Sequence, residues 1–334
     1  MLELSNKMID KSKLYVISVC SNPVRYKRRW ELFQQFQRHM HDVEGNLISV
    51  EIGYGARFPQ IIPKGSYTYE DPTTLLFQSN EELWHKENLI NLALQFLTQV
   101  DPAWEGVCWI DGDVHFQRHD IIEETAHQLQ HYDFVQMFSH ALDLGPNLEP
   151  IRMNHGFVWA YHNNQFQAPQ GAGYGGYYNE KGVFWHPGFA WAARRTALEK
   201  VQLLDKAILG AGDHHMALSL IGQGARSLPK GISKGYRDMV LQWQEQAEYH
   251  IRRNVGYVPG TITHYWHGSK KSRKYVERWK ILIDNQYDPV KDISREPSGI
   301  YRLNMNHGLR SVKLRDQIRA YFRQRNEDCT YVED

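Results

Sequence analysis

Two carboxylates separated by a single residue, Asp111 and Asp113, are the strongest chemical signal in the sequence. They follow the apolar run Val107 to Ile110, which is typical of a buried strand. Because ligands of open α/β sheets bind at the carboxyl ends of strands, we expect the pair to face a ligand site. Their hard oxygen atoms suit Mn²⁺ or Mg²⁺, and such an ion can bridge a diphosphate. The intervening Gly112 is expected to leave room for a phosphate to approach.

A third acidic residue, Asp213, follows the glycine-rich residues 210–212 and precedes two adjacent histidines. At the start of a helix it could serve as an N-cap. Its carboxylate could instead act as a general base and accept a proton from an attacking hydroxyl. His214 and His215 cannot both point into one cleft from a helix, so we expect one to contact a ligand and the other to be structural. The clustering of histidine and aspartate is also compatible with the metal site of a hydrolase.

The segment 264–271 reads His-Tyr-Trp-His-Gly-Ser-Lys-Lys. A histidine just after a strand could complete a metal site, and Lys270 and Lys271 could neutralise a diphosphate. The alternative for the two lysines is a solvated basic turn. A second basic group begins the helix predicted for 24–41, where a bound anion such as a diphosphate would relieve the conflict between the cations and the helix dipole. The alternative there is a solvated basic face.

The elements that must position these residues alternate along the chain. Apolar runs predict strands over 14–20, 46–52, 106–110, 133–138 and 261–266, and a strand or buried turn over 184–193. Periodic apolar stripes predict helices over 24–41, 81–97, 194–203, 213–221, 275–283 and 309–323. This alternation predicts an α/β fold with a mostly parallel sheet. The glycine- and tyrosine-rich residues 171–178 predict a loop over a cleft, or else an ordinary surface loop.

Composition sets wider bounds. The 334 residues are 42% hydrophobic, with 39 Lys+Arg against 38 Asp+Glu, and this balance argues against a protein that coats nucleic acid. The 10 Trp and 19 Tyr fit either a sugar-binding cleft or an aromatic core. Three cysteines give no disulfide framework, and no apolar run approaches the length of a membrane span, which predicts a cytoplasmic, soluble protein. We expect one domain over 1–290 and a helical tail over 291–334 that packs on it and could touch an anionic acceptor such as a lipid head group or DNA.

Together the clusters resemble the GT-A glycosyltransferases, over roughly residues 13 to 285. The nearest resemblance is to the β-galactosyltransferase-like group, in which an Arg/Lys-x-x-x-Leu-x-Asn helix precedes the Asp-x-Asp strand. Residues 86–91, Lys-Glu-Asn-Leu-Ile-Asn, are similar to that helix. The segments 186–190 and 212–215 occupy the places of the group's Gly-Gly-x-x-aromatic segment and Gly-Glu-Asp-Asp block. The resemblance implies a Rossmann-like GT-A fold, with a mixed, mostly parallel sheet flanked by helices.

The resemblance also implies an activity and a site. It implies a transferase that moves a sugar from a nucleotide diphosphate sugar, with UDP the commonest nucleotide and Mn²⁺ or Mg²⁺ as the cofactor. The metal ligands would be Asp111, Asp113 and His267, and the base would be Asp213. The donor would contact the end of the first strand near Ser21 and, beyond it, Asn22, Arg25, Lys86, Asp111 and Lys271. The acceptor side would include Trp191, His214 and Tyr174.

The sequence departs from the group in ways that leave alternatives open. Gly212 stands where the group has Glu, and two histidines replace acids after Asp213. Residues 267–271 also resemble the His-x-x-Gly-x-x-Lys end of retaining GT-A galactosyltransferases, whereas a base at Asp213 favours inversion. The other hypotheses are transfer to a modified DNA base, a silent sugar-binding module, and a hydrolase or nucleotidyltransferase whose metal is held by Asp111, Asp113, His214 and His267.

Overall fold

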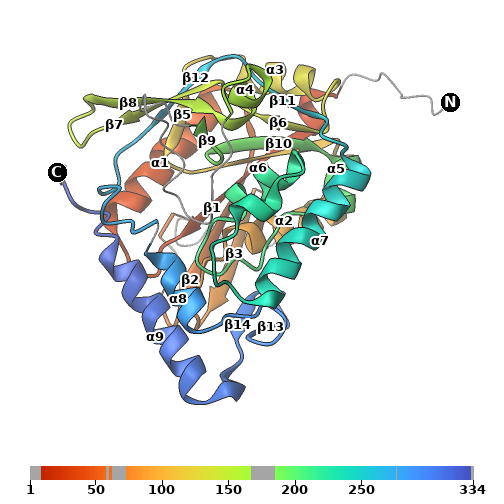
Figure 1. Cartoon of the computed structure of the whole chain (residues 1–334). Coiled ribbons are helices and arrows are strands. Elements are labelled where there is room, and N and C mark those ends of the chain that lie inside the picture. Colours follow the sequence, from red (N-terminus) through yellow and green to blue (C-terminus); the bar gives the residue numbers. More distant parts are fainter. Residues whose placement is uncertain (1–8, 58–59, 62–72, 167–184, 276, 332–334) are drawn as a thin grey trace.

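A computed structural model describes residues 9–57, 60–61, 73–166, 185–275 and 277–331. Figure 1 shows a central sheet with helices packed against it, and α9 with the β13–β14 hairpin at the end of the molecule opposite to β7 and β8. The strands are β1 (Leu14–Ser21), β2 (Asn46–Tyr54), β3 (Thr74–Ser79), β4 (Gly106–Ile110), β5 (Val114–Phe116), β6 (Phe134–Gln136), β7 (His140–Leu144), β8 (Pro150–Gly156), β9 (Trp185–His186), β10 (Ala190–Arg194), β11 (Val255–Tyr257), β12 (Thr261–His264), β13 (Ile293–Arg295) and β14 (Tyr301–Leu303).

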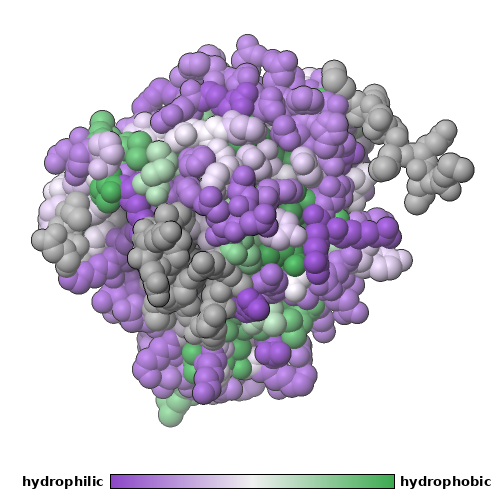
Figure 2. Space-filling model, turned by 45° about the horizontal axis from the view of Figure 1, so that its top comes forward, coloured by the Kyte–Doolittle hydropathy of each residue, from purple (hydrophilic) through white to green (hydrophobic). Residues whose placement is uncertain are grey.

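The helices connect these strands. They are α1 (Lys27–Asp42), α2 (Lys86–Val100), α3 (Ile121–Gln128), α4 (Phe157–His162), α5 (Arg195–Val201), α6 (Gly212–Leu220), α7 (Lys234–His250), α8 (Arg278–Asp284) and α9 (Leu309–Gln324). Short 3₁₀ turns lie at Lys11–Lys13, Gly224–Ser227 and Met305–His307. In the described part of the chain, no helix is both long and apolar enough to cross a bilayer. Figure 2 shows a mainly hydrophilic face on which apolar residues form small separate groups.

The described residues place seven strands in the main sheet, in the order β11-β6-β10-β4-β1-β2-β3. β3, β2, β1 and β4 run parallel to one another, and β11 runs parallel to β6. β10 is antiparallel to both of its neighbours, β4 and β6. The sheet is therefore mixed and mostly parallel, as the sequence predicts.

Each face of the sheet carries its own apolar core, because successive side chains of a strand point to opposite faces. Ile17, Val107 and Trp109 face a core built with α2, α5, α6 and α7. Val16 and Cys108 face a second core built with α1 and α3. Strand ends that carry polar residues are thus fixed in position by buried strands on both sides.

A second sheet, in the order β5-β12-β7-β8-β9, brings a distant segment to the end of β4. β12 pairs antiparallel with β5, which directly follows the Asp-Gly-Asp turn. The backbone N–H of Tyr265 donates to the backbone oxygen of Asp113 at 2.9 Å. This pairing places residues 264–267 beside Asp113, although about 150 residues separate them in sequence.

The predicted strands at 14–20, 46–52 and 106–110 and the predicted helices at 213–221 and 309–323 match observed elements to within two residues. The helix predicted for 24–41 begins only at Lys27, and the helix predicted for 81–97 begins only at Lys86. The sequence analysis did not predict α7 or the β7–β8 pair. The tail is not only helical, since it also contains β13 and β14, and the predicted boundary after residue 290 stays a prediction.

Gly112 is required by packing and not by a ligand. A Cβ placed there would lie 2.5 Å from Cδ2 of Phe33, a buried residue of α1. The space that the sequence analysis assigned to a phosphate is therefore filled by an aromatic ring. The close approach fixes the Asp-Gly-Asp turn against α1.

We expect Gly112→Ala to destabilise the protein by ~1–3 kcal/mol, the usual cost of overpacking a filled core. Chemical denaturation of both proteins measures the loss. In the Phe33→Ala background, where the ring is gone, the same substitution should cost much less. Equal costs in the two backgrounds would show that Phe33 does not impose the glycine.

Candidate metal and nucleotide-sugar site

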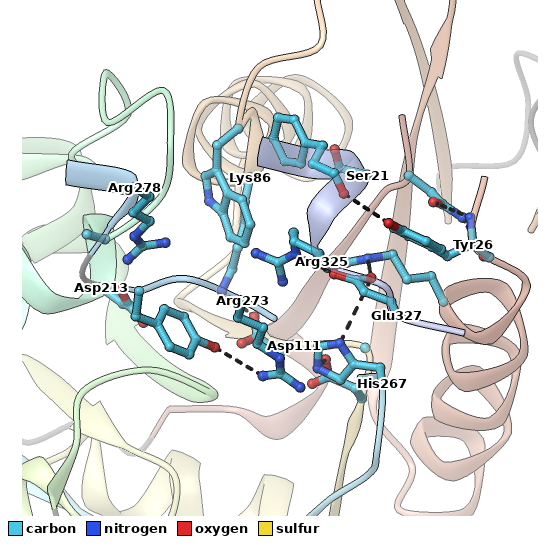
Figure 3. A pocket seen from close by; sticks show the side chains of 18 of the residues that line it. Ser21, Tyr26, Lys86, Asp111, Asp213, His267, Arg273, Arg278, Arg325 and Glu327 are labelled. Carbon is cyan, nitrogen blue, oxygen red and sulfur yellow. Dashed lines mark hydrogen bonds and ion pairs between the residues drawn. The ribbon is translucent and has the colours of Figure 1, made fainter. Parts of the chain in front are cut away.

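A cavity of about 520 Å³ opens where β1, β4 and β12 end. Figure 3 shows side chains from the strand ends, from the loop after β12 and from the C-terminal tail pointing into it. Its basic lining residues are Arg29, Lys86, Lys270, Lys271, Arg273, Lys274, Arg278 and Arg325. Its acidic lining residues are Glu87, Asp111, Asp113, Asp213, Glu277 and Glu327.

Asp113, His264 and His267 form the chemical centre of this cavity. One ligand atom from each lies within 4.8 Å of the others. His267 Nε2 lies 2.8 Å from Asp113 Oδ2 and 3.3 Å from His264 Nε2. Burial lowers the pKa of His267 to about 3, so its ring is neutral, which is the form that binds metal ions.

A buried carboxylate oxygen left without a partner supports a cation between the three residues. Among the described residues, the buried Asp113 Oδ1 has no hydrogen-bond partner. His264 Nδ1 donates to Asp143 Oδ1 at 2.8 Å, so its Nε2 carries a lone pair aimed at His267. Two imidazole nitrogens and a carboxylate oxygen that converge in this way are a donor set for Mn²⁺ or Zn²⁺. We conclude that Asp113, His264 and His267 could hold a divalent ion.

Asp111, predicted as a metal ligand, is not part of this group. Its Oδ1 forms an ion pair with Lys86 Nζ from the first turn of α2. Burial raises the pKa of Asp111, with the ammonium of Lys86 opposing the shift. Asp111 and Lys86 both line the cavity, where they could bind hydroxyl groups of a ligand. The group that could hold a cation thus contains His264 and not Asp111, and a metal contact of Asp111 stays a prediction.

Asp213 lines the cavity from the first turn of α6. It is not the N-cap of that helix, because the N-cap is Ala211, whose φ is 78°. Its Oδ2 lies so close to Gly188 that a Cβ there would be 2.2 Å away. Glu87 lies against the same turn, since a Cβ on Gly212 would be 2.9 Å from its Cδ. Two glycines therefore allow two carboxyl groups to enter the cavity side by side.

Glu87 is buried, and burial raises its pKa to about 7, with Lys86 lowering it and Asp213 raising it further. A carboxyl group with this pKa exchanges its proton near neutral pH. Sequence reasoning named Glu87 only as part of the 86–91 segment. Its burial beside Asp213 follows from the turn at residues 210–212, which no local pattern in α2 indicates.

Arg273 is a buried cation that lines the cavity and forms no ion pair with a described carboxylate. Its side chain is 5% exposed, and its Nη1 donates to the Tyr275 hydroxyl at 3.0 Å. Its Nε has no hydrogen-bond partner in the described residues, and no described carboxylate lies within ion-pair distance of it. A buried, unpaired guanidinium is costly, which favours an anionic ligand here. The sequence analysis did not select Arg273, although it belongs to the basic segment 270–274.

The basic start of α1 already has an anionic partner. The carboxylate of Asp328, from the C-terminal tail, accepts from the backbone N–H groups of Lys27 and Arg28 at 3.1 and 2.8 Å. Arg29 pairs with Glu327 of the same tail. The diphosphate expected at this helix start is therefore replaced by two tail carboxylates.

The other predicted donor contacts differ in their placement. Asn22 lines the cavity, but its side-chain amide is engaged with the backbone of Tyr26 at 2.7 and 2.9 Å. Arg25 is absent from the lining, and its guanidinium lies 5.5 Å from the centre of the Trp30 ring. Lys271 lines the cavity and is exposed.

The two predicted acceptor-side residues that the structure describes, Trp191 and His214, are absent from the cavity lining. Trp191 lies on the α2-facing side of β10, where it is buried in the core and donates to the Pro187 oxygen at 2.8 Å. His214 is buried near Trp185 and is absent from the cavity lining. Its neighbour His215 is structural, bonded to Ser227 and Tyr236. Tyr174 and the predicted loop 171–178 lie outside the described residues.

Comparisons with known proteins add little. No protein-family model matches the chain, and no curated protein matches it. Two of the similar solved structures are each 12% identical to this chain. One is a proposed nucleotide-diphospho-sugar transferase from Desulfovibrio desulfuricans, with a TM-score of 0.33 over 96% of this chain and 99% of that chain. The other is mannose-1-phosphate geranyltransferase from Thermus thermophilus, with a TM-score of 0.29 over 76% of this chain and 74% of that chain. TM-scores this low support no inference about activity. Neither protein is described as a β-galactosyltransferase, so that narrower resemblance stays a prediction.

The raised pKa of Glu87 predicts a pH-dependent stability. The folded state holds this proton up to a pH of about 7, whereas the usual carboxyl value is 4.5. The contribution of this proton to the free energy of unfolding is therefore fully present below pH 4.5 and is lost as the pH rises through about 7. Glu87→Gln has no proton to lose, so it should gain stability relative to the wild type, on the order of 3 kcal/mol by pH 8. Urea denaturation of both proteins between pH 5 and 8 measures this gain, and a difference that does not change with pH would contradict it.

Proposed function

We propose that the chain is a metal-dependent glycosyltransferase that moves a sugar from a nucleotide diphosphate sugar to an acceptor hydroxyl. One observation carries the proposal: a single cavity combines a cation-binding trio, a buried unpaired guanidinium and a separate carboxylate. These are respectively Asp113 with His264 and His267, then Arg273, and then Asp213. The resemblance to GT-A glycosyltransferases, with their Mn²⁺ or Mg²⁺ and most often UDP, supports the same interpretation.

The chemistry follows from these groups. A divalent cation held by Asp113, His264 and His267 would neutralise the charge that develops on the leaving nucleoside diphosphate. Arg273 donates hydrogen bonds to the phosphate oxygens and so replaces their lost hydration. Asp213 accepts the proton of the acceptor hydroxyl while the acceptor oxygen bonds to the anomeric carbon. The bond between that carbon and the phosphate oxygen breaks, and its electron pair leaves with the diphosphate.

Two further features of the proposal concern stereochemistry and the sugar. A carboxylate base that activates the acceptor directly favours a single displacement, and therefore inversion at the anomeric carbon. Lys86 and Asp111 offer a donor and an acceptor side by side for hydroxyl groups of the donor. The acceptor is a compound with a free hydroxyl group. It could be a carbohydrate, and the alternative acceptors are a modified DNA base and an anionic lipid-linked glycan.

A metal-dependent hydrolase is the second candidate, and the trio itself favours it. Two histidines and one carboxylate also form the ligand set of zinc hydrolases, in which a metal-bound water attacks the substrate. His214 cannot contribute to such a site, because it is absent from the cavity lining. The hydrolase candidate does not require Arg273 to bind a nucleoside diphosphate.

A thermal-shift screen of UDP-, GDP-, dTDP- and CMP-sugars with and without Mn²⁺ tests the proposal. One nucleotide sugar should stabilise the wild type only with metal, and ~2.7 kcal/mol is expected at 100 times its dissociation constant. Asp113→Asn should lose this stabilisation. Asp213→Asn should keep it but fail to transfer the sugar, because it lacks only the base. Stabilisation by metal without any effect of nucleotide sugars would favour the hydrolase.

Replacement of Arg273 separates ligand binding from folding. Arg273→Gln should weaken donor binding about 10- to 100-fold, the effect of losing a charged hydrogen bond. Without ligand its stability should equal or exceed that of the wild type, because a buried unpaired charge is removed. Isothermal titration with the donor and urea denaturation measure the two effects. Arg315→Gln, at a residue outside the cavity lining that is paired with Asp316, is the control and should change neither. Unaltered donor binding in Arg273→Gln would contradict this role.

A further inference from the structure

We propose that Glu327, in the C-terminal tail, is a positioning residue for the metal-ligating ring of His267. The inference rests on the metal site proposed above. It makes the tail a working part of that site and not only a segment packed on the domain. Each of the two histidines has a carboxylate behind the ring nitrogen that faces away from the metal position. This carboxylate is Asp143 for His264 and Glu327 for His267.

His264 shows the complete arrangement. Its Nδ1 donates to Asp143 Oδ1 at 2.8 Å, which fixes the ring and leaves the Nε2 lone pair facing the metal position. Asp143 is itself buried and is held by Asn154 and Lys270 at 2.8 and 2.5 Å. Such carboxylate–histidine pairs behind metal sites orient the ring and raise its basicity.

His267 shows the same arrangement in an open form. Its Nδ1 is buried without a hydrogen-bond partner and lies 4.0 Å from Glu327 Oε2. If the ring proton sits on Nε2, it is shared with Asp113, and the bare Nδ1 faces a carboxylate. If the proton sits on Nδ1, it points at Glu327 Oε2, and a small rotation of the ring that shortens the 4.0 Å separation makes the hydrogen bond, while Nε2 is free to bind a cation. Glu327 therefore favours the tautomer that a metal ligand needs.

The carboxylate of Glu327 is held firmly in this position. Its residue is fully buried, at 0% exposure. Arg29 donates to both of its oxygens, from Nη2 to Oε1 at 2.8 Å and from Nε to Oε2, and Arg325 Nε donates to Oε1. Figure 3 shows Glu327 between Arg325 and His267. The two guanidiniums align the carboxylate so that Oε2, which also accepts from Arg29, is the oxygen that faces His267.

The loop that carries His267 is interlocked with the tail. Gly268, at φ 86°, lets the tail approach so closely that a Cβ there would lie 2.8 Å from the oxygen of Asn326. Trp266 Nε1 donates to the oxygen of Cys329 on the other side of Glu327. Contacts of the residues on both sides of His267 thus hold its loop against the tail segment that carries Glu327.

Binding of Mn²⁺ to the full-length chain tests the proposal without relying on activity. Glu327→Gln should raise the Mn²⁺ dissociation constant about 10- to 100-fold, as expected when a carboxylate behind a ligand histidine is lost. Asp143→Asn, behind His264, should have an effect of the same size. Asp328→Asn is the matched control, because it neutralises the next tail carboxylate, which contacts α1 and not His267. Electron paramagnetic resonance or calorimetric titration at pH 7.5 measures all four proteins.

The outcomes separate this inference from the proposed function. If Glu327→Gln is folded and binds Mn²⁺ as the wild type does, the inference fails and the metal site stands. If Asp328→Asn loses as much affinity as Glu327→Gln, tail docking is responsible and the positioning role fails. If the wild type does not bind Mn²⁺, both proposals fail.

A second measurement needs no variant. In the Zn²⁺-loaded wild type, ¹⁵N spectra should show His267 protonated at Nδ1, with the downfield proton of a hydrogen bond to a carboxylate. A rapidly exchanging Nδ1 proton would contradict the role of Glu327, even if Glu327→Gln does not fold.

Discussion

The meeting of one half-buried carboxylate with two buried imidazoles is the constraint on which the rest of this structure depends. Asp113, His264 and His267 bring their ligand atoms within 4.8 Å of one another in a partly closed cavity. Buried polar atoms that lack partners are costly, so this arrangement needs a compensating ligand. It also needs a rigid frame, because three side chains from two distant segments must meet.

The frame consists of two sheets that share the Asp-Gly-Asp turn. β4 is fully buried and lies between β1 and β10, which fixes the start of the turn. β5 continues from the turn and pairs with β12, which fixes His264 relative to Asp113, and the bond from the Tyr265 N–H to the Asp113 oxygen starts the loop that carries His267 beside them. The ring of Phe33 closes the turn from the side of α1. The position of a cation bound by these three residues would therefore be set by strand pairing and core packing at Asp113 and His264 and by the loop after β12 at His267.

The sequence predicted the parts of this frame that depend on local pattern. The apolar run of β4 and the acids after it identified the turn and the sheet edge. The pairing of Asp111 with Lys86 could not be predicted, because it joins α2 to the end of β4 across the fold. His264 was harder to assign than His267, because only the pairing of β12 with β5 brings it to the end of the Asp-Gly-Asp turn. Trp191 was assigned by residue type, whereas strand alternation places it in the core.

The tail illustrates a second limit of local patterns. Basic residues at the start of α1 suggested a free anion site, but Glu327 and Asp328 lie about 300 residues away in sequence and neutralise it. Such long-range charge pairing leaves no periodic trace. Because these tail carboxylates neutralise the start of α1, the positive charge that lacks an ion-pair partner lies in the loop after β12. There, Arg273 has no carboxylate partner among the described residues. An anionic ligand is therefore favoured on the side of the cavity that this loop lines.

Around Lys86, acidic groups outnumber basic ones, in contrast to the surroundings of Arg273. This excess of acidic groups affects which kind of ligand can bind there. Asp111, Glu87 and Asp213 all act on this one ammonium, which raises its pKa against the effect of burial. Burial in turn raises the pKa of Glu87 to about 7 and also raises that of Asp111. At neutral pH such a group is divided between a carboxylate, which accepts hydrogen bonds, and a carboxylic acid, which can also donate one. Sugar hydroxyls both donate and accept, so a cluster that can present either partner suits a sugar better than an apolar or purely anionic ligand.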